Sequence, residues 1–150
     1  MASANNSNND PIANGTLDFQ LAYGDCDTVG IAYFGIYYRW MERCYSTWLA
    51  AHGLRSGDLL GQVGVLTVGL SSSAQYKQTA KVLDKLRCQA VADKIGNSSY
   101  AVGFEFTRDG ELLTKGQMVF AVRDADFAKA PIPQRMRDLL QTLPAPGFDV

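Results

Sequence analysis

The most constraining feature of this sequence is a run of apolar side chains at helical spacing in its first third. They recur every three or four residues, so a helix carries all of them on one wide face. They are Tyr37, Trp40, Met41, Cys44, Tyr45, Trp48 and Leu49. Gly53, directly after His52, is a residue that commonly ends a helix. The pattern predicts one long helix over about Gly35 to His52, and other elements have to cover its apolar face.

The rest of the chain is predicted to form mainly strands, which can cover the apolar face of the helix. Alternation of apolar and polar residues, typical of a half-buried strand, marks one segment before the helix and four after it. The segments are Thr16–Tyr23, Val63–Gln78, Lys85–Lys94, Ser99–Arg108 and Leu112–Arg123. Asp109 and Gly110 suit a tight hairpin turn between the last two, because Gly tolerates a positive φ. We expect the last four segments to form a meander.

A short second helix is predicted within Pro131–Leu143, near the end of the chain. Pro133 suits its first turn. Its apolar side would hold Met136, Leu139, Leu140 and Leu143. The expected fold class is therefore α+β, with a five-stranded antiparallel sheet around one long helix and a short C-terminal helix.

Length and charge limit the classes of protein that remain. A chain of 150 residues suits one domain, and we expect it over residues 16–143. Residues 1–15, rich in Asn and Ser, are expected to form a disordered tail, and residues 144–150 a second tail. The formal charge of -1 gives no general field that favours nucleic acid or an anionic membrane. No apolar run approaches the roughly 20 residues of a membrane span.

The three cysteines, Cys26, Cys44 and Cys88, lie far apart in the chain. Their odd number and spacing match neither a disulfide framework nor a set of metal ligands. We expect Cys44 and Cys88 to be small buried side chains, while Cys26 lies in the loop described next. Free thiols fit a reducing cytoplasm. No Gly-rich phosphate motif or nucleotide fingerprint is present, so no cofactor is expected.

The segment between the first strand and the long helix carries the residues best suited to chemistry. It reads YGDCDTVGIAYFGIY over Tyr23–Tyr37 and holds two acids, Asp25 and Asp27. The start of a helix offers unpaired backbone N–H groups and a dipole that favours negative charge. A carboxylate beside such donors can attack a carbonyl or deprotonate water while the donors stabilise the carbonyl oxygen. This pairing is the minimum for acyl transfer, and a thioester is the easier target because a thiolate leaves without strong acid assistance.

The run GDCDTVGIAYFGIYYRWME resembles the signature of the hotdog-fold thioesterases of the 4-hydroxybenzoyl-CoA thioesterase family. The order of the predicted elements agrees with that family over about Thr16 to Leu143, including a final I-P-x-x-[LM]-R-x-L helix. The resemblance implies a hotdog fold and hydrolysis of an acyl-CoA. It also implies a homodimer or homotetramer with active sites at the subunit interface. CoA would be part of the substrate rather than a cofactor.

The resemblance also assigns roles to residues of the loop. Asp27, the second acid of the D-x-D pair, would be the catalytic carboxylate. The backbone N–H of Phe34 would polarise the thioester carbonyl, and Gly30 would let the loop fold back towards the active site. The position of Tyr37 in the first helical turn, rather than the resemblance, places it near the substrate carbonyl. Tyr33 either lines the acyl pocket or has a simple packing role.

The loop departs from the family pattern at Tyr33-Phe34-Gly35-Ile36. Many relatives carry a His after the aromatic residue and an Asn just ahead of the conserved tyrosine. Their absence makes the site less polar and leaves a second donor to the carbonyl unassigned. Taken alone, Asp25 and Asp27 suit a solvated turn with a capping Asp. The family pattern favours a catalytic Asp27 and a structural Asp25 that accepts a hydrogen bond within the loop.

Three questions stay open at this level. Asp27 acts either as a nucleophile, through a mixed anhydride, or as a base for water. The acyl group, which the aromatic residues near the helix start suggest is aromatic or bulky, is carried either by CoA or by an acyl carrier protein in polyketide or fatty acid release. A non-catalytic hotdog module that binds acyl groups is the alternative of another class.

Other polar residues have weaker functional interpretations. His52, the one histidine, lies at the expected helix end, where a structural role is favoured. One serine of Ser71-Ser72-Ser73 is a minor candidate for a substrate contact. A group of basic residues forms either a solvated sheet edge or a landing surface for CoA phosphates or an acidic carrier protein. The group consists of Lys77, Lys81, Lys85, Arg87 and Lys94.

Overall fold

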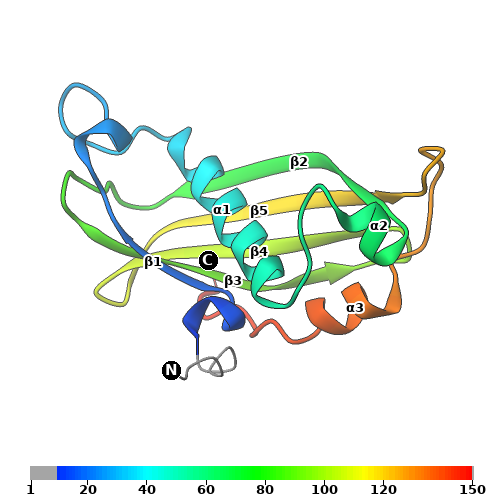
Figure 1. Ribbon diagram of the computed structural model, residues 1–150. Coiled ribbons are helices and arrows are strands. Elements are labelled where there is room, and N and C mark those ends of the chain that lie inside the picture. The colour runs from blue at the N-terminus through cyan, green and yellow to red at the C-terminus, as the bar shows by residue number, and fades with distance from the viewer. Residues whose placement is uncertain (1–9, 150) are drawn as a thin grey trace, which may run out of the picture.

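The computed structural model describes residues 10–149 and consists of a curved sheet, one long helix and several short helical segments (Figure 1). The helical segments are η2 (Pro11–Asn14), η3 (Tyr23–Asp25), α1 (Ile36–Ala51), α2 (Leu59–Val63) and α3 (Gln134–Leu140). The strands are β1 (Thr16–Gln20), β2 (Leu66–Tyr76), β3 (Lys85–Ile95), β4 (Ser99–Arg108) and β5 (Glu111–Arg123). No helix within residues 10–149 is long and apolar enough to cross a membrane.

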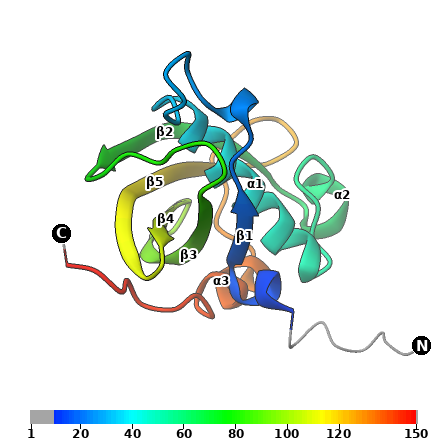
Figure 2. The ribbon, with the colours of Figure 1, turned by 90° about the vertical axis from the view of Figure 1, so that its left-hand side faces the viewer.

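The five strands form one antiparallel sheet in the order β1-β3-β4-β5-β2. Seen from its end, the sheet curves around α1 (Figure 2). The α+β architecture predicted from the sequence is therefore confirmed. The predicted four-strand meander is wrong, because β2 pairs with β5 rather than with β3. The turns between β3 and β4 and between β4 and β5 are so short that the strands they join must be neighbours in the sheet. The link 77–84 between β2 and β3 is long enough to cross the sheet.

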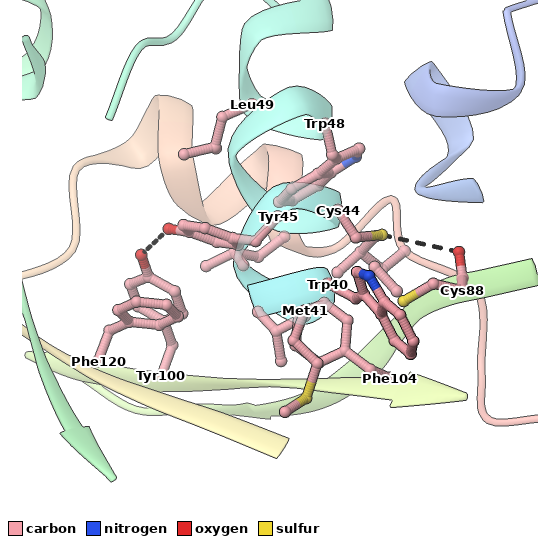
Figure 3. Packing of buried hydrophobic residues seen from close by; sticks show 14 of the residues in the cluster. Trp40, Met41, Cys44, Tyr45, Trp48, Leu49, Cys88, Tyr100, Phe104 and Phe120 are labelled. Atoms are coloured by element: carbon pink, nitrogen blue, oxygen red, sulfur yellow. Dashed lines mark hydrogen bonds between the residues drawn. The ribbon is translucent and has the colours of Figure 1, made fainter. Parts of the chain in front are cut away.

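The apolar face of α1 is buried against the inner face of the sheet, as the helical spacing predicted (Figure 3). Tyr45 stacks on Phe120 with ring centroids 4.6 Å apart, and its hydroxyl is 2.5 Å from that of Tyr100. A Cβ at position 116 would collide with the Met41 sulfur, so Gly116 allows the helix to approach β5 closely. Fully burying a large apolar side chain stabilises a fold by roughly 1.5–3 kcal/mol. Because α1 buries eight residues, its packing on the sheet is a major source of stability.

Several element boundaries differ from the sequence prediction for local reasons. The strand expected from Val63 starts at Leu66, because Val63 belongs to α2, which ends at Gly64 in a left-handed conformation with φ 80°. The first strand ends at Gln20 rather than Tyr23, which begins the short 3-10 helix η3. The C-terminal helix is confirmed and spans the shorter range Gln134–Leu140.

The described part of the expected N-terminal tail is ordered, which differs from the prediction. Residues 10–15 include η2, in which Ala13 is buried, and the Asp10 side chain accepts a hydrogen bond from the Ile12 N–H. The Nε2 atom of His52 lies 2.7 Å from the Ala13 carbonyl oxygen, so η2 is tied to the end of α1. The apolar side chains in this segment, invisible to a count of Asn and Ser, explain the difference. Residues 1–9 of the expected tail lie outside the described residues.

The C-terminal segment crosses the face of the sheet that points away from α1. The Ala92 N–H donates to the Pro144 carbonyl at 2.7 Å. The Glu105 carboxylate, only 3% exposed, accepts the N–H groups of Gly147 and Phe148 at 3.0 and 3.2 Å. Lys115 Nζ donates to the Phe148 carbonyl at 2.6 Å and lies 3.8 Å from Glu105. Glu105 therefore holds the end of the chain on the sheet.

The link 77–84 is held by Asp84, which joins it to the sheet. Arg108 donates to Asp84 Oδ2 at 2.6 Å, and the Lys81 N–H donates to the same oxygen at 2.8 Å. Burial raises the pKa of Asp84, but the Lys81 N–H and the Arg108 guanidinium together outweigh it and lower the pKa below the ordinary value. The charged form of Asp84 is thus favoured by folding.

We predict that Glu105→Ala loosens the C-terminal segment and lowers the free energy of unfolding by about 1–3 kcal/mol, since two N–H groups lose their acceptor. Hydrogen exchange of the Gly147 and Phe148 amides should accelerate at least tenfold. Glu111→Ala, at the exposed first residue of β5, is the matched control. Unchanged exchange at both amides in Glu105→Ala would show that the carboxylate does not hold the segment.

We predict that Asp84→Asn lowers the free energy of unfolding by about 1–2 kcal/mol at pH 7. Because folding lowers the Asp84 pKa, its contribution is fully present above the ordinary value of 3.8 and is lost as the pH falls further. Urea unfolding at pH 7, 5 and 3 should therefore show a gap between wild type and variant that is the same at pH 7 and 5 and narrower at pH 3. Asp126→Asn, at an exposed position, serves as the control, and a gap independent of pH would contradict the role of charge.

Candidate active site

The loop between β1 and α1 folds back on itself as a small hairpin around Gly30. The Asp27 N–H donates to the Ile31 carbonyl at 2.9 Å, and the Gly30 N–H donates to the Asp27 carbonyl at 3.0 Å. Cys26 and Ala32 form an antiparallel bridge across the base of this hairpin. Gly30 has φ 80°, a left-handed conformation that favours glycine. The residue proposed as the turning point thus occupies the turn.

The same loop is anchored to the link between β2 and β3. The Ala32 N–H donates to the Ala80 carbonyl at 2.8 Å, and the Val82 N–H donates to the Gly30 carbonyl at 3.1 Å. Since Asp84 holds this link to Arg108, the sheet supports the loop through a chain of hydrogen bonds.

The Asp27 side chain has one oxygen engaged and one oxygen open. Oδ1 accepts the Val29 N–H at 2.9 Å and the Ile31 N–H at 3.3 Å, which is an Asx turn. Oδ2 has no hydrogen-bond partner within residues 10–149, and the side chain is exposed. Asp25 also has one oxygen engaged, since its Oδ2 accepts the Ala22 N–H at 2.9 Å. Of the two acids, Asp27 is held by two N–H groups and has an exposed side chain, whereas Asp25 accepts one N–H and is half-buried.

The start of α1 offers backbone donors close to this loop in the chain. Its first two hydrogen bonds each span three residues. The Ile36 N–H donates to the Tyr33 carbonyl at 3.0 Å, and the Tyr38 N–H donates to the Gly35 carbonyl at 3.3 Å. The N–H groups of Phe34 and Gly35 have no partner in the described part of the chain. An anion or a carbonyl oxygen can accept hydrogen bonds from such groups.

The aromatic residues at the helix start divide into buried and exposed ones. Tyr37 is 2% exposed, and its ring centroid lies 5.0 Å from those of Trp40 and Phe106. Burial raises the pKa of the Tyr37 hydroxyl, although the adjacent Thr114 hydroxyl lowers it. Tyr33 and Phe34 are 42% and 71% exposed. Tyr37 is therefore a core residue below the site, whereas Tyr33 and Phe34 present aromatic surface beside it.

One residue of this site was missed by sequence reasoning. The Tyr76 hydroxyl donates to the Phe34 carbonyl at 2.9 Å. Tyr76 is the last residue of β2, and the expected meander would have placed this strand next to β3. No local signal in the sequence distinguishes Tyr76; the contact emerges only when β2 is placed beside β5.

The remaining candidates are not brought together at the site. Arg87 is paired with Asp18 at 2.7 Å, a contact that lowers the Asp18 pKa, so the expected basic group is partly neutralised. Lys77 and Lys81 are exposed on the link beside the loop, while Lys94 lies near the far end of β3. The serines at positions 71–73 are exposed on β2. No group of three or more His, Cys, Asp or Glu in residues 10–149 is placed to hold a metal ion.

Cys26 is placed in the loop but suits a structural thiol better than a nucleophile. Burial and the nearby charges of Asp25 and Asp27 all raise its pKa. Its Sγ lies 3.7 Å from the Ala22 carbonyl oxygen. The protonated thiol is a weak nucleophile, so Cys26 is a poorer candidate for the reactive group of the loop than the Asp27 carboxylate.

Comparisons with known proteins agree with this architecture. The sequence model of the thioesterase superfamily matches residues 29–115, more than half of the chain. A 1,4-dihydroxy-2-naphthoyl-CoA hydrolase from Prochlorococcus marinus strain NATL2A is 26% identical over 99 residues, which are 59% of this chain and 62% of that protein. The chain thus matches less than two thirds of this relative's length.

Solved structures share the fold at lower identity. The crystal structure of a 1,4-dihydroxy-2-naphthoyl-CoA thioesterase from Synechocystis superposes with a TM-score of 0.76 at 19% identity, over 84% of this chain and 94% of that one. The structure named BH1999 gentisyl-coenzyme A thioesterase gives a TM-score of 0.72 at 21% identity, over 83% and 98%. These likenesses confirm the hotdog fold. With a sheet curved around one long helix and a family match over more than half of its length, the chain belongs to the thioesterase superfamily.

Proposed function

We propose that the protein is an acyl-CoA thioesterase whose catalytic carboxylate is Asp27. The observation that carries the proposal is the pairing of an oriented, half-engaged carboxylate with unpartnered N–H groups at the start of α1. The superfamily match begins at residue 29. The role of Asp27 therefore rests on the geometry of the loop and on its resemblance to the 4-hydroxybenzoyl-CoA thioesterases.

In the proposed reaction the thioester carbonyl oxygen accepts a hydrogen bond from the Phe34 N–H. Negative charge develops on this oxygen in the transition state, where the donor and the α1 dipole stabilise it. Attack by Asp27 Oδ2 forms a mixed anhydride and expels the CoA thiolate, and water then hydrolyses the anhydride. In the second route Asp27 Oδ2 takes a proton from water, whose oxygen attacks the carbonyl directly, and the C–S bond then breaks to release the free acid and the CoA thiolate. No cofactor takes part in either route.

The two routes differ in the fate of the Asp27 carboxylate oxygens. A single turnover in water labelled with oxygen-18, followed by mass spectrometry of the Asp27 peptide, tests for the anhydride. Label in the Asp27 carboxylate establishes the anhydride route, with water attacking the Asp27 carbonyl, because base catalysis leaves none there.

We propose an aromatic or otherwise bulky flat acyl group as the substrate class. Two of the similar proteins are named for 1,4-dihydroxy-2-naphthoyl-CoA and one for gentisyl-CoA, all aromatic acyl thioesters. Exposed aromatic side chains of Tyr33 and Phe34 beside the site fit such a group. Release of a polyketide or fatty acyl chain from a carrier protein is the enzymatic alternative, and a non-catalytic acyl-binding module is the alternative of another class.

We further propose that a second copy of the chain completes the acyl pocket. Four surface hollows of about 290 to 610 Å³ are all lined by residues other than Asp27, Tyr33 and Phe34. β2 has a neighbour on one side only, so its other edge carries unpaired backbone groups along Leu66–Tyr76. Antiparallel pairing of this edge with its copy gives a homodimer, from which a homotetramer can form. All three cysteines are free thiols, which fits our proposal of a cytoplasmic location.

We predict that Asp27→Asn lowers kcat for aryl-CoA hydrolysis by about 10²- to 10⁴-fold. The Asn side-chain oxygen can still accept the Val29 and Ile31 N–H groups, so the loop conformation and the thermal stability should persist. A thiol-release assay across aryl, short-chain, long-chain and β-keto acyl-CoAs, with matched acyl-carrier substrates, measures the effect and identifies the acyl group. Asp25→Asn is the matched control and should retain activity within a few-fold; full turnover by Asp27→Asn on every good substrate would refute the assignment.

We predict that Ser71→Lys weakens the homodimer at least tenfold. If the whole of β2 pairs with its copy, the two-fold axis passes by Ser71 at the centre of the strand. Two lysines then face each other, and like charges directly opposite destabilise an antiparallel pair. Sedimentation equilibrium gives the dissociation constant, with Ser56→Lys as an exposed control of equal charge change. A wild-type monomer, or an unchanged dimer in Ser71→Lys, would remove β2 as the interface.

A further inference from the structure

The carbonyl group of Phe34 is bound from outside the helix that it precedes. The first two bonds of α1 end on the carbonyls of Tyr33 and Gly35, so neither reaches the Phe34 oxygen between them. The Tyr76 hydroxyl donates to that oxygen at 2.9 Å. A side chain from the edge strand β2 therefore supplies the hydrogen bond that the helix does not.

This bond fixes more than one carbonyl, because a peptide group is planar. The Phe34 carbonyl and the Gly35 N–H belong to the same trans peptide and point in opposite directions. Holding the oxygen therefore sets the direction of the Gly35 N–H. The Phe34 N–H belongs to the preceding peptide, which joins the held peptide at the Phe34 Cα. The N–H groups of Phe34 and Gly35 are the two donors of the candidate site that were found without a partner within residues 10–149.

Tyr76 is 43% exposed and is held by its strand and by two aromatic rings. It pairs with Thr114 of β5 at the end of β2. Its ring centroid lies 5.5 Å from that of Tyr37 and 6.1 Å from that of Phe34, both with edge-to-face geometry. Because Tyr37 is buried in the core, the position of the Tyr76 hydroxyl is set by the sheet and by the aromatic core.

The Tyr76 hydroxyl also stays protonated over the working range of an enzyme. Burial raises the pKa of Tyr76 to about 12, and the neighbouring Tyr38 hydroxyl adds to the rise. A hydroxyl with this pKa remains a donor at neutral and moderately alkaline pH, so its bond to Phe34 does not titrate there.

We propose that Tyr76 is a positioning residue, which orients the Phe34–Gly35 peptide so that the backbone N–H groups at the start of α1 meet the carbonyl oxygen of the substrate. The proposal rests on the proposed thioesterase function. Tyr76 acts through the backbone, whereas Asp27 and the N–H groups contact the reacting atoms.

Tyr76→Phe tests this role, because it removes the hydroxyl and keeps the ring. A displaced N–H donor stabilises the transition state less than the same donor in its wild-type position. We therefore expect kcat for aryl-CoA hydrolysis to fall about tenfold. KM should change less than twofold, and the thermal midpoint should change little. The matched control is Tyr23→Phe, since Tyr23 is 61% exposed and its hydroxyl has no partner within residues 10–149.

The sequence allows a direct readout of the peptide itself. Phe34–Gly35 is the only Phe–Gly pair in the chain. Labelling with carbonyl-¹³C phenylalanine and ¹⁵N glycine therefore leaves a single HNCO cross-peak, which reports the Phe34 carbonyl and the Gly35 N–H together. We expect this cross-peak to move in Tyr76→Phe and to stay in place in Tyr23→Phe. The control gains a second Phe–Gly pair at positions 23–24, which adds a separate cross-peak that the wild type lacks.

The two readouts separate failure of this inference from failure of the proposed function. An active wild type with unchanged kcat in Tyr76→Phe overturns the positioning role and leaves the thioesterase function standing. An unmoved cross-peak overturns it as well, because the hydroxyl then does not hold the peptide. A wild type that hydrolyses no thioester refutes the function, and with it any positioning role for catalysis, whatever the cross-peak shows.

Discussion

Burial of the wide apolar face of α1 is the constraint on which the rest of the structure depends. Eight residues of this helix are buried, including both tryptophans of the chain. A flat sheet would leave part of this face in water, whereas the curved sheet covers it from β1 round to β2 (Figure 2). Gly116 lets Met41 settle directly onto β5, so the axis of the helix is fixed relative to the sheet.

A helix fixed in this way places its first turn against the edge of the sheet. Tyr37 packs into the core from that turn, and Tyr76 meets it from the end of β2. The loop that carries Asp27 is then hydrogen-bonded to the link that follows β2. The position of the carboxylate relative to the helix thus derives from core packing on one side and from the link 77–84 on the other.

Periodicity was sufficient for the parts of the fold that local sequence determines. The helical stripe and the five strands came out close to their predicted bounds, since each pattern reflects burial of that segment alone. The place of β2 in the sheet was not predicted, because strand order depends on which strand edges pair when distant parts of the chain come together. The contact between Tyr76 and Phe34 joins residues 42 positions apart and depends on that order, so no local pattern could reveal it.

The loop shows a different limit of sequence reasoning. By local chemistry alone its spacing favours an Asx turn, and only the family pattern favours a catalytic acid. Asp27 makes the turn with Oδ1, while Oδ2 has no partner within residues 10–149. The two interpretations are compatible, because a carboxylate held by one oxygen is oriented for chemistry with the other. Ala13 and its neighbours were similarly hidden by a composition that is mostly polar.

The distribution of titratable groups fits the proposed hydrolysis of a thioester better than hydrolysis of an oxygen ester. His52, the one histidine, is bound to the Ala13 carbonyl oxygen at the far end of α1. With 1.5 Å of rise per residue, that end lies about 24 Å from the first turn, too far to protonate a leaving group. A thiol has a pKa of about 8.5, against about 16 for water, so a thiolate departs without a proton where an alkoxide would need one. A site with one free carboxylate oxygen and backbone donors is therefore matched to the bond that needs the least acid assistance.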